Sequence, residues 1–184
     1  MKHTIERRKP EGIKDHVALG LTTWGVGYLP IAPGTWGSMV GIVIYLSIES
    51  LLEYLRRTGF GFMNGPSQAQ VYAVLAVGLV LFAIAGIWSS GRSIDLLGNS
   101  DPSEAVVDEV MGQLVVFLFV PFGIGWHYIL AGFLLFRLFD IWKPYPIDGL
   151  QELPGGLGVC ADDLVAGVYA GVCLAVIYAV SLQI

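Results

Sequence analysis

Charged residues are scarce in this chain. Only 14% of its 184 residues are Asp, Glu, Lys or Arg, whereas about a quarter is usual in soluble domains. Hydrophobic residues make up 55% of the sequence, and the mean hydropathy is +0.69. The length suits one domain, and so much apolar surface needs lipid as well as a core to cover it. This composition therefore predicts an integral membrane protein.

Cysteine and histidine are also rare, which excludes several kinds of active site. Cys160 and Cys173 have neither the spacing of a metal finger nor that of a disulfide framework. Cysteine phosphatases have an arginine six residues after the cysteine, and neither Cys160 nor Cys173 has one there. None of His3, His16 and His127 lies beside an acidic cluster, which disfavours a zinc site or a phosphohistidine. A Walker A loop and a serine nucleophile elbow are absent as well.

Basic residues are too few for a nucleic-acid-binding surface, because the net charge is −5. The first 16 residues are polar and basic, and no apolar signal segment follows them directly. We therefore expect residues 1–19 to form a charged cytoplasmic lead, either a short amphipathic interfacial helix or an irregular segment. Residues 20–184 are predicted to form a single membrane-embedded domain.

The apolar segments predict an all-α, polytopic membrane bundle of about five helices. Pro121, Gly123 and Gly125 interrupt the third segment, which predicts a short helical hairpin with a tight turn. Each arm has about 15 residues, or about 22 Å of helix, so thinned bilayer or neighbouring protein must shield it. The four segments run over residues 39–55, 69–89, 106–139 and 164–182.

The distribution of cations orients the bundle. With the N-terminus in the cytoplasm and every helix crossing, eight cations lie inside and two outside, as the positive-inside rule requires. Asp108 and Asp140 each lie 16 residues from Ile124 in the turn, so they are predicted at similar depth near the cytoplasmic boundary. The inside set is Lys2, Arg7, Arg8, Lys9, Lys14, Arg92, Arg137 and Lys143, and the outside set is Arg56 and Arg57.

The first acidic cluster lies in the segment DPSEAVVDEVMGQ. Asp101 or Ser103 could cap the following helix, and Glu104 could favour its dipole. Asp108 and Glu109 lie where the apolar run has already begun. Ionisable groups inside a membrane helix are costly and usually functional, so these two acids are candidate site residues.

The second and third clusters are FRLFDIWKPYP and GGLGVCADDLVAG. Arg137 and Asp140 share a helix face and could form a structural ion pair, and Lys143 could extend toward lipid headgroups. The functional alternative is that the cations bind phosphate and Asp140 binds metal. Asp162 and Asp163 could cap a helix, or one could bind metal while the other orients a partner.

An uncharged loop, GVGYLPIAPGTWGS, precedes the first apolar segment. The backbone amides of Gly34, Thr35 and Gly37 would then lie at a helix N-terminus, a plausible anion site. The Thr35 side chain could cap that helix or contact phosphate. Without a further signal, a flexible turn explains the glycines equally well.

Together these residues favour a hard cation and phosphate chemistry. Mg²⁺ prefers oxygen ligands and usually keeps several waters. With cysteine, serine and histidine nucleophiles excluded, attack by metal-activated water on phosphorus remains. A small membrane ion or metal transporter that uses intramembrane carboxylates is the alternative. The available acids are Asp108, Glu109, Asp140, Asp162 and Asp163.

Four motifs in fixed order resemble the phosphatidylglycerophosphatase A family: PIAPGTWGS, VVDEVMGQ, FRLFDIWKPYPI and GGLGVCADDLVAG. The resemblance implies a Mg²⁺-dependent phosphatase of the bacterial inner membrane, with its active site facing the cytoplasm. Its partners would be the bilayer and phosphatidylglycerophosphate, which it would hydrolyse to phosphatidylglycerol and inorganic phosphate in glycerophospholipid biosynthesis.

The resemblance also implies roles for individual residues. Asp108, Glu109, Asp140 and Asp163 would be catalytic, and these four with Asp162 would bind the metal. The residues on the phosphate side would be Thr35, Arg137 and Lys143.

Overall fold

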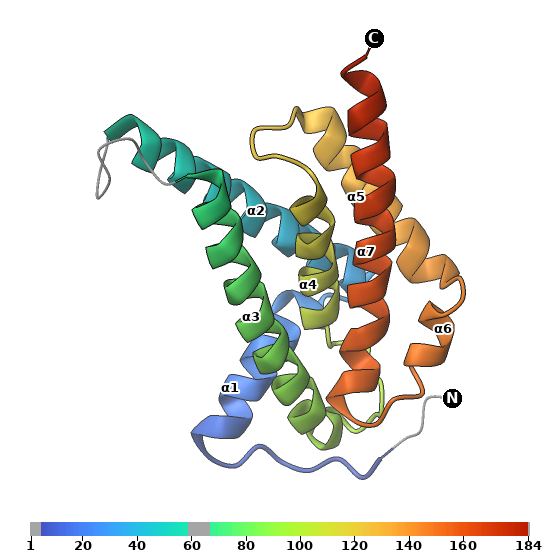
Figure 1. Ribbon diagram of the computed structural model, residues 1–184. Coiled ribbons are helices and arrows are strands. Elements are labelled where there is room, and N and C mark those ends of the chain that lie inside the picture. Colours follow the sequence, from blue (N-terminus) through green and yellow to red (C-terminus); the bar gives the residue numbers. More distant parts are fainter. Residues whose placement is uncertain (1–4, 59–66, 184) are drawn as a thin grey trace.

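The computed structural model describes residues 5–58 and 67–183, and within these ranges all regular secondary structure is helical (Figure 1). This confirms the predicted all-α class. The helices of these ranges are α1 (Gly12–Thr23), the 3₁₀ turn η1 (Val26–Tyr28), α2 (Pro33–Thr58), α3 (Gln68–Leu97), α4 (Val107–Val116), the 3₁₀ turn η2 (Phe117–Phe119), α5 (Trp126–Trp142), α6 (Ile147–Leu150) and α7 (Gly156–Ser181).

Three of these helices, α2, α3 and α7, are long and apolar enough to cross a membrane. Their large hydrophobic side chains point outward in many places, as at Val43, Leu81 and Val176. Such exposure suits a lipid-facing surface and would be unfavourable in water. The prediction of a membrane-embedded helical bundle is therefore supported by the way these helices display their apolar residues.

The predicted hairpin is present as α4 and α5, with the chain reversing between Val120 and Gly125. The ten residues of α4 measure only about 15 Å along the helix axis. Figure 1 shows α4 in the middle of the bundle, between α2, α3 and α7. Neighbouring protein therefore shields this short helix, and Val107, Val110 and Met111 are fully buried.

The described ranges hold seven α-helices, two more than the five expected. α1 was expected only as one of two alternatives for the lead, and α6 was not predicted. α1 starts inside the predicted charged lead and continues into the Gly-rich segment. Its buried side is polar or small, with Asp15, Ala18 and Thr22, whereas Ile13 and Val17 face outward. A helix with this inverted pattern gives no ordinary amphipathic signal.

Three helix boundaries also differ clearly from the predictions. α2 begins at Pro33, before the predicted start at Met39, and proline suits the first position of a helix. α3 continues to Leu97, past the predicted end near Ser89, because Arg92 pairs with buried Asp15 of α1. α7 begins at Gly156, before the predicted start near Leu164. The predicted cap of the first acidic helix is wrong, since α4 begins after Val106 without any side-chain cap.

Two glycines let α4 and α7 pack with their backbones close together. A Cβ on Gly112 would lie 2.6 Å from the Asp163 carbonyl oxygen, and one on Gly167 would lie 2.4 Å from the Gly112 carbonyl oxygen. Contacts of this kind between small residues are common in membrane helix pairs. Asp108 and Asp163 each lie four residues, or one turn, before one of these glycines. The crossing therefore brings the two carboxylates side by side.

Candidate active site

A polar cavity of about 1000 Å³ lies where α2, α4 and α7 begin and where α5 ends. These helix ends meet at one side of the bundle (Figure 1). All five acids expected to bind metal line this cavity. The charged residues that line it are Asp101, Asp108, Glu109, Asp140, Lys143, Asp148, Glu152, Asp162 and Asp163.

The centre of the cavity is a group of three carboxylates. Asp108, Glu109 and Asp163 each offer an oxygen atom, and these three atoms lie within 4.8 Å of one another. Asp108 and Asp163 are buried, and Glu109 is partly buried. Oxygen atoms this close, drawn from two helices, form a donor set of the type that hard divalent cations prefer. Asp140 and Asp162 line the same cavity beside this group.

Two carboxylate oxygens of residues that line the cavity have no hydrogen-bond partner among residues 5–58 and 67–183. They are Oε2 of Glu109 and Oδ1 of Asp162, and both atoms are buried. A buried, unpaired carboxylate oxygen is unfavourable unless a cation or donor satisfies it. The residues present therefore fit Mg²⁺, both by the chemistry of their oxygens and by these two unsatisfied positions.

Lys143 brings positive charge to the carboxylates. It ends α5 in a left-handed conformation, and its Nζ donates to Oδ2 of Asp162 at 2.5 Å. Burial by itself would lower the pKa of Lys143, but the hydrogen bond to Asp162 and the nearby carboxylates outweigh it and raise the pKa. The ammonium group therefore stays protonated, and a phosphate group in the cavity would meet a fixed cation.

Arg137 lies between α5 and the start of α2. Its Nη1 is 2.6 Å from Oδ2 of Asp140, although the two groups are not aligned as a hydrogen bond. The predicted ion pair on one helix face is therefore present. Nη1 is buried and has no hydrogen-bond partner among the described residues. Arg137 also does not line the cavity that these residues form, so the structure places it beside Asp140 and not in the open part of the site.

The start of α2 touches the carboxylates through Gly34. A Cβ at this position would lie 2.2 Å from Oε1 of Glu109 and 3.0 Å from Nη1 of Arg137. Pro33 and Gly34 line the cavity, whereas Thr35 is absent from the lining that the described residues form. The Thr35 amide donates to the Ala32 carbonyl at 2.9 Å, so it is engaged within the turn.

The structure adds residues that the sequence analysis did not select. Asp148, Gln151 and Glu152 line the cavity from α6 and the turn after it, and all three are exposed. They form the water-facing mouth. The available signal was the pair of acids in PIDGLQELPGG, directly after the KPYP motif, but their depth and direction depend on α6.

A family model described as Phosphatidylglycerophosphatase A matches residues 20–178, most of the chain. The chain belongs to the phosphatidylglycerophosphatase A family. Membership in this family makes it an enzyme, a phosphatase associated with the membrane, and disfavours the transporter alternative. No solved structure matches the chain.

Three curated relatives cover most of the chain. A Bacteroides thetaiotaomicron protein, provisionally named phosphatidylinositol-3-phosphatase, is 36% identical over 84% of this chain and 89% of its own length. Phosphatidylglycerophosphatase A of Haemophilus influenzae is 32% identical, covering 80% and 79%. Phosphatidylglycerophosphatase A of Escherichia coli is 30% identical, covering 79% and 73%.

Proposed function

We propose that the protein is a Mg²⁺-dependent lipid phosphatase that hydrolyses phosphatidylglycerophosphate to phosphatidylglycerol and inorganic phosphate. The observation that carries this proposal is the group formed by Asp108, Glu109 and Asp163, whose oxygens converge within 4.8 Å in a cavity at one end of the membrane helices. The two relatives named as phosphatidylglycerophosphatase A support the choice of substrate. This reaction would belong to glycerophospholipid biosynthesis.

The carboxylates of Asp108, Glu109 and Asp163 would hold the metal, with Asp140 and Asp162 beside them. When bound, Mg²⁺ supplies neutralisation of phosphate charge and activation of water. Lys143 would hold phosphate oxygens, because it lines the cavity and places its ammonium group next to the carboxylates. Arg137 would support the site by pairing with Asp140, and would reach phosphate only if its side chain moved toward the cavity. A cavity with both carboxylates and cations suits a phosphate monoester that arrives with a divalent cation.

The chain's own groups account for the proton transfers. One carboxylate of the set would accept the proton of a water molecule as that water's oxygen bonds to phosphorus. The bond between phosphorus and the glycerol oxygen would break, and that oxygen would take up the proton that the carboxylate had accepted. The fixed cation at Lys143 would stabilise the charge that develops on the phosphate oxygens.

Three exposed aromatic residues lie within two positions of residues that line the cavity. Trp36 stands in the first turn of α2, and Trp142 and Tyr145 stand on either side of Lys143. Tryptophan and tyrosine are enriched where membrane meets water. Their positions support entry of a lipid phosphate from the adjoining leaflet. With the orientation expected from the cations, this is the cytoplasmic leaflet of the bacterial inner membrane.

The test uses purified protein in vesicles that contain one lipid phosphate monoester. Phosphate release is measured with Mg²⁺, with EDTA, and with EDTA followed by excess Mg²⁺. We expect release from phosphatidylglycerophosphate only when Mg²⁺ is present, and restoration after its return. Release that persists in EDTA would overturn the metal dependence.

Parallel vesicles containing phosphatidylinositol 3-phosphate test the substrate, because one relative is provisionally named for that activity. We expect a higher kcat/KM for phosphatidylglycerophosphate. The reverse preference would assign the chain to inositol lipids. Soluble glycerol phosphate serves as a third substrate and shows whether the acyl chains are required.

A further inference from the structure

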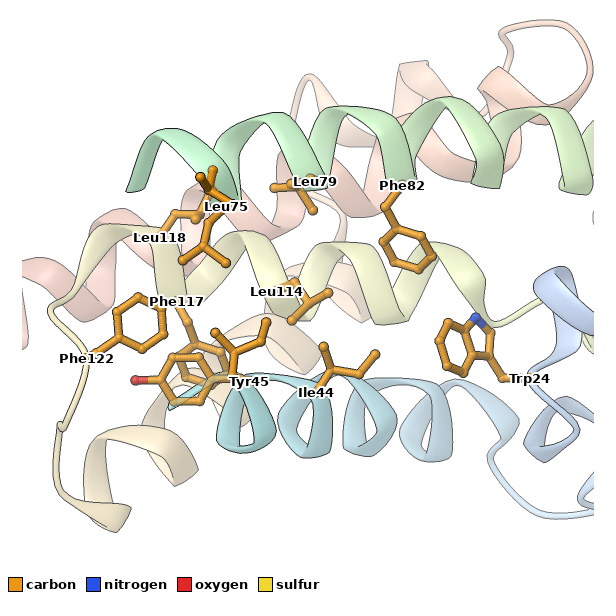
Figure 2. Close-up of a pocket in the computed structure, with 13 residues that line it drawn as sticks. Trp24, Ile44, Tyr45, Leu75, Leu79, Phe82, Leu114, Phe117, Leu118 and Phe122 are labelled. Carbon is orange, nitrogen blue, oxygen red and sulfur yellow. The ribbon is translucent and has the colours of Figure 1, made fainter. Parts of the chain in front are cut away.

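A second cavity, of about 380 Å³, lies between α2, α3 and α4 and is almost entirely apolar (Figure 2). Ile44 of α2, Leu75 and Leu79 of α3, and Leu114 of α4 form its walls. Figure 2 shows Trp24 at one end and the rings of Tyr45 and Phe122 at the other. The cavity is therefore elongated along the helices.

This cavity is separate from the active site, because none of the residues that the structure describes lines both. Leu114 follows Asp108 by six residues on α4, which turns its side chain by about 240°. α4 thus carries the carboxylates on one side and the wall of the apolar cavity on the other. A molecule in this cavity would not contact the reacting phosphate.

The surroundings of the cavity indicate what can enter it. Two of its walls, α2 and α3, are candidate membrane spans. Val74 lines the cavity and is also exposed, with 71% of its surface accessible, so the cavity opens toward the lipid side of the bundle. Inside a bilayer, the molecules available at such an opening are lipids, and hydrocarbon matches the apolar walls.

The end of the cavity at Trp24 contains a hydrogen-bond donor that needs an acceptor. The indole Nε1 of Trp24 is buried and has no hydrogen-bond partner among the described residues. Trp24 packs edge-on against Phe82, with ring centroids 6.0 Å apart, and lies near Val107 at the start of α4. This is the active-site side of the bundle. An unpaired N–H in an apolar place is unfavourable unless an acceptor joins it.

We propose that this cavity binds one acyl chain of a diacyl phospholipid from the leaflet on the active-site side. On binding, a small rotation of the indole brings the buried Trp24 Nε1 to the cavity, where it donates a hydrogen bond to the ester carbonyl of that chain, and the chain runs between α2 and α3 toward Phe122. A phospholipid places an acceptor directly at the head of a long hydrocarbon chain, which matches one donor at the end of an apolar cavity. The bound lipid is distinct from the substrate molecule in the active site.

A large side chain at Gly78 is expected to block the cavity. It lines the wall, and a Cβ placed on it would meet no atom within 4 Å. Gly78→Phe therefore fills the cavity without displacing backbone, and replacing glycine within a helix also favours the helix. Val80→Phe is the matched control, because Val80 is exposed and lies about 200° around α3 from Gly78.

The experiment uses the full chain in vesicles that contain a phosphatidylcholine with a photoreactive diazirine in the middle of one acyl chain. Labelled peptides are quantified by mass spectrometry. We expect labelling around Leu79 and Leu114, and excess unlabelled phosphatidylcholine should prevent it by competition. This labelling should fall at least several-fold in Gly78→Phe and should persist in Val80→Phe. Labelling no stronger there than at lipid-facing Val176, or not competed in the wild type, would overturn the proposal.

A separate measurement tests the hydrogen bond between Trp24 and the ester carbonyl. Trp24→Phe keeps an aromatic ring and removes the N–H donor. We expect this variant to weaken competition by a diester phospholipid several-fold and to leave competition by the matching diether lipid unchanged, because the ether lacks the carbonyl acceptor. An equal loss for both lipids would overturn the hydrogen bond at Trp24. Retained phosphatase activity verifies that the Gly78 and Val80 variants are folded.

Discussion

Asp140 and Asp163 are buried carboxylates in a cavity that also contains Lys143. Replacing either carboxylate by its amide keeps the shape but removes the charge that a cation requires. We expect Asp140→Asn and Asp163→Asn each to lower kcat on the order of 100-fold or more, with unchanged membrane expression. Phosphate release and protein yield are measured together.

Glu53→Gln is the control for these variants, since Glu53 is exposed and pairs with Arg57 at the far end of α2. It should retain wild-type turnover. Wild-type turnover in both aspartate variants as well would mean that these acids have only a structural role.

Lys143 is predicted to bind phosphate, and its substitution separates charge from packing. Lys143→Met keeps the stem and removes the ammonium group, so we expect KM for the lipid phosphate to rise. The loss of a hydrogen bond to a charged group, about 1.5–3 kcal/mol, corresponds to a rise of about tenfold or more. Lys143→Arg should recover part of it. A KM unchanged in Lys143→Met would remove this residue from the phosphate site.

At the scale of single residues, the sequence located the acids well. Asp108, Glu109, Asp140, Asp162 and Asp163 meet in one cavity because charge in an apolar run is costly and therefore conspicuous. Positions that depend on main-chain geometry were harder to predict from the sequence. Thr35 does not line the cavity formed by the described residues. Its position follows from the turn at Ala32, whose carbonyl accepts from the Thr35 amide, and no side-chain pattern in the sequence indicates this turn.

The helices α4 and α7 approach closely only because Gly112 and Gly167 lack side chains. We expect Gly112→Val to force the two helices apart, since its Cβ would also lie 2.4 Å from the Phe136 ring. Overpacking of this kind commonly costs about 1–3 kcal/mol. The melting temperature and the activity should both fall, as measured by thermal unfolding and phosphate release in detergent.

Gly20→Ala is the matched glycine control. Gly20 lies within α1, and a Cβ there would meet no atom within 4 Å. This substitution should leave activity unchanged and slightly raise stability, because alanine favours helix. Equal damage from both substitutions would contradict the close-packing role of Gly112.

The ion pair between α1 and α3 predicts that the stability of the protein depends on pH. Asp15 is fully buried, and its carboxylate accepts hydrogen bonds from Arg8, the Glu11 amide and Arg92. The hydrogen bond from Arg8, followed by those from Glu11 and Arg92, holds the pKa of Asp15 well below its usual range. Its contribution to stability is therefore complete above the unfolded pKa of about 3.9 and is lost as the pH falls below it.

Asp15→Asn should lower the melting temperature at pH 7 and flatten its decline between about pH 4 and pH 2. Thermal unfolding across this range, in detergent, measures both effects. Glu53→Gln should follow the wild-type curve. An Asp15→Asn curve parallel to wild type at all pH values would show that this ion pair does not couple α1 to α3.

Among whole elements, the long helices were predictable and the short ones were not. α2, α3 and α7 contain apolar segments that lipid requires, so their sequences alone identify them. α6 has only four residues, and α1 buries a polar side against Arg92 and Ser93 of α3. Both form through tertiary contacts, which a local pattern does not contain.

The orientation of the whole molecule can be tested with single cysteines. Ser103, beside the cavity, is expected in the cytoplasm, and Glu53 near the other end of α2 is expected outside; both are exposed. With Cys160 and Cys173 replaced by alanine, an impermeant maleimide should label Glu53→Cys in right-side-out vesicles and Ser103→Cys in inverted vesicles. The opposite pattern would reverse the orientation.

Exposed acids line the active-site cavity, and the exposed Trp36 and Trp142 lie within two residues of the lining residues Gly34 and Lys143, so we expect the cavity to border both water and lipid. The proposed reaction turns one amphiphile into a soluble ion and a less charged lipid. Each of these prefers a different phase, and each has a direct exit into that phase. Departure of the ion by diffusion then draws hydrolysis forward, and the diacylated product never has to leave its leaflet.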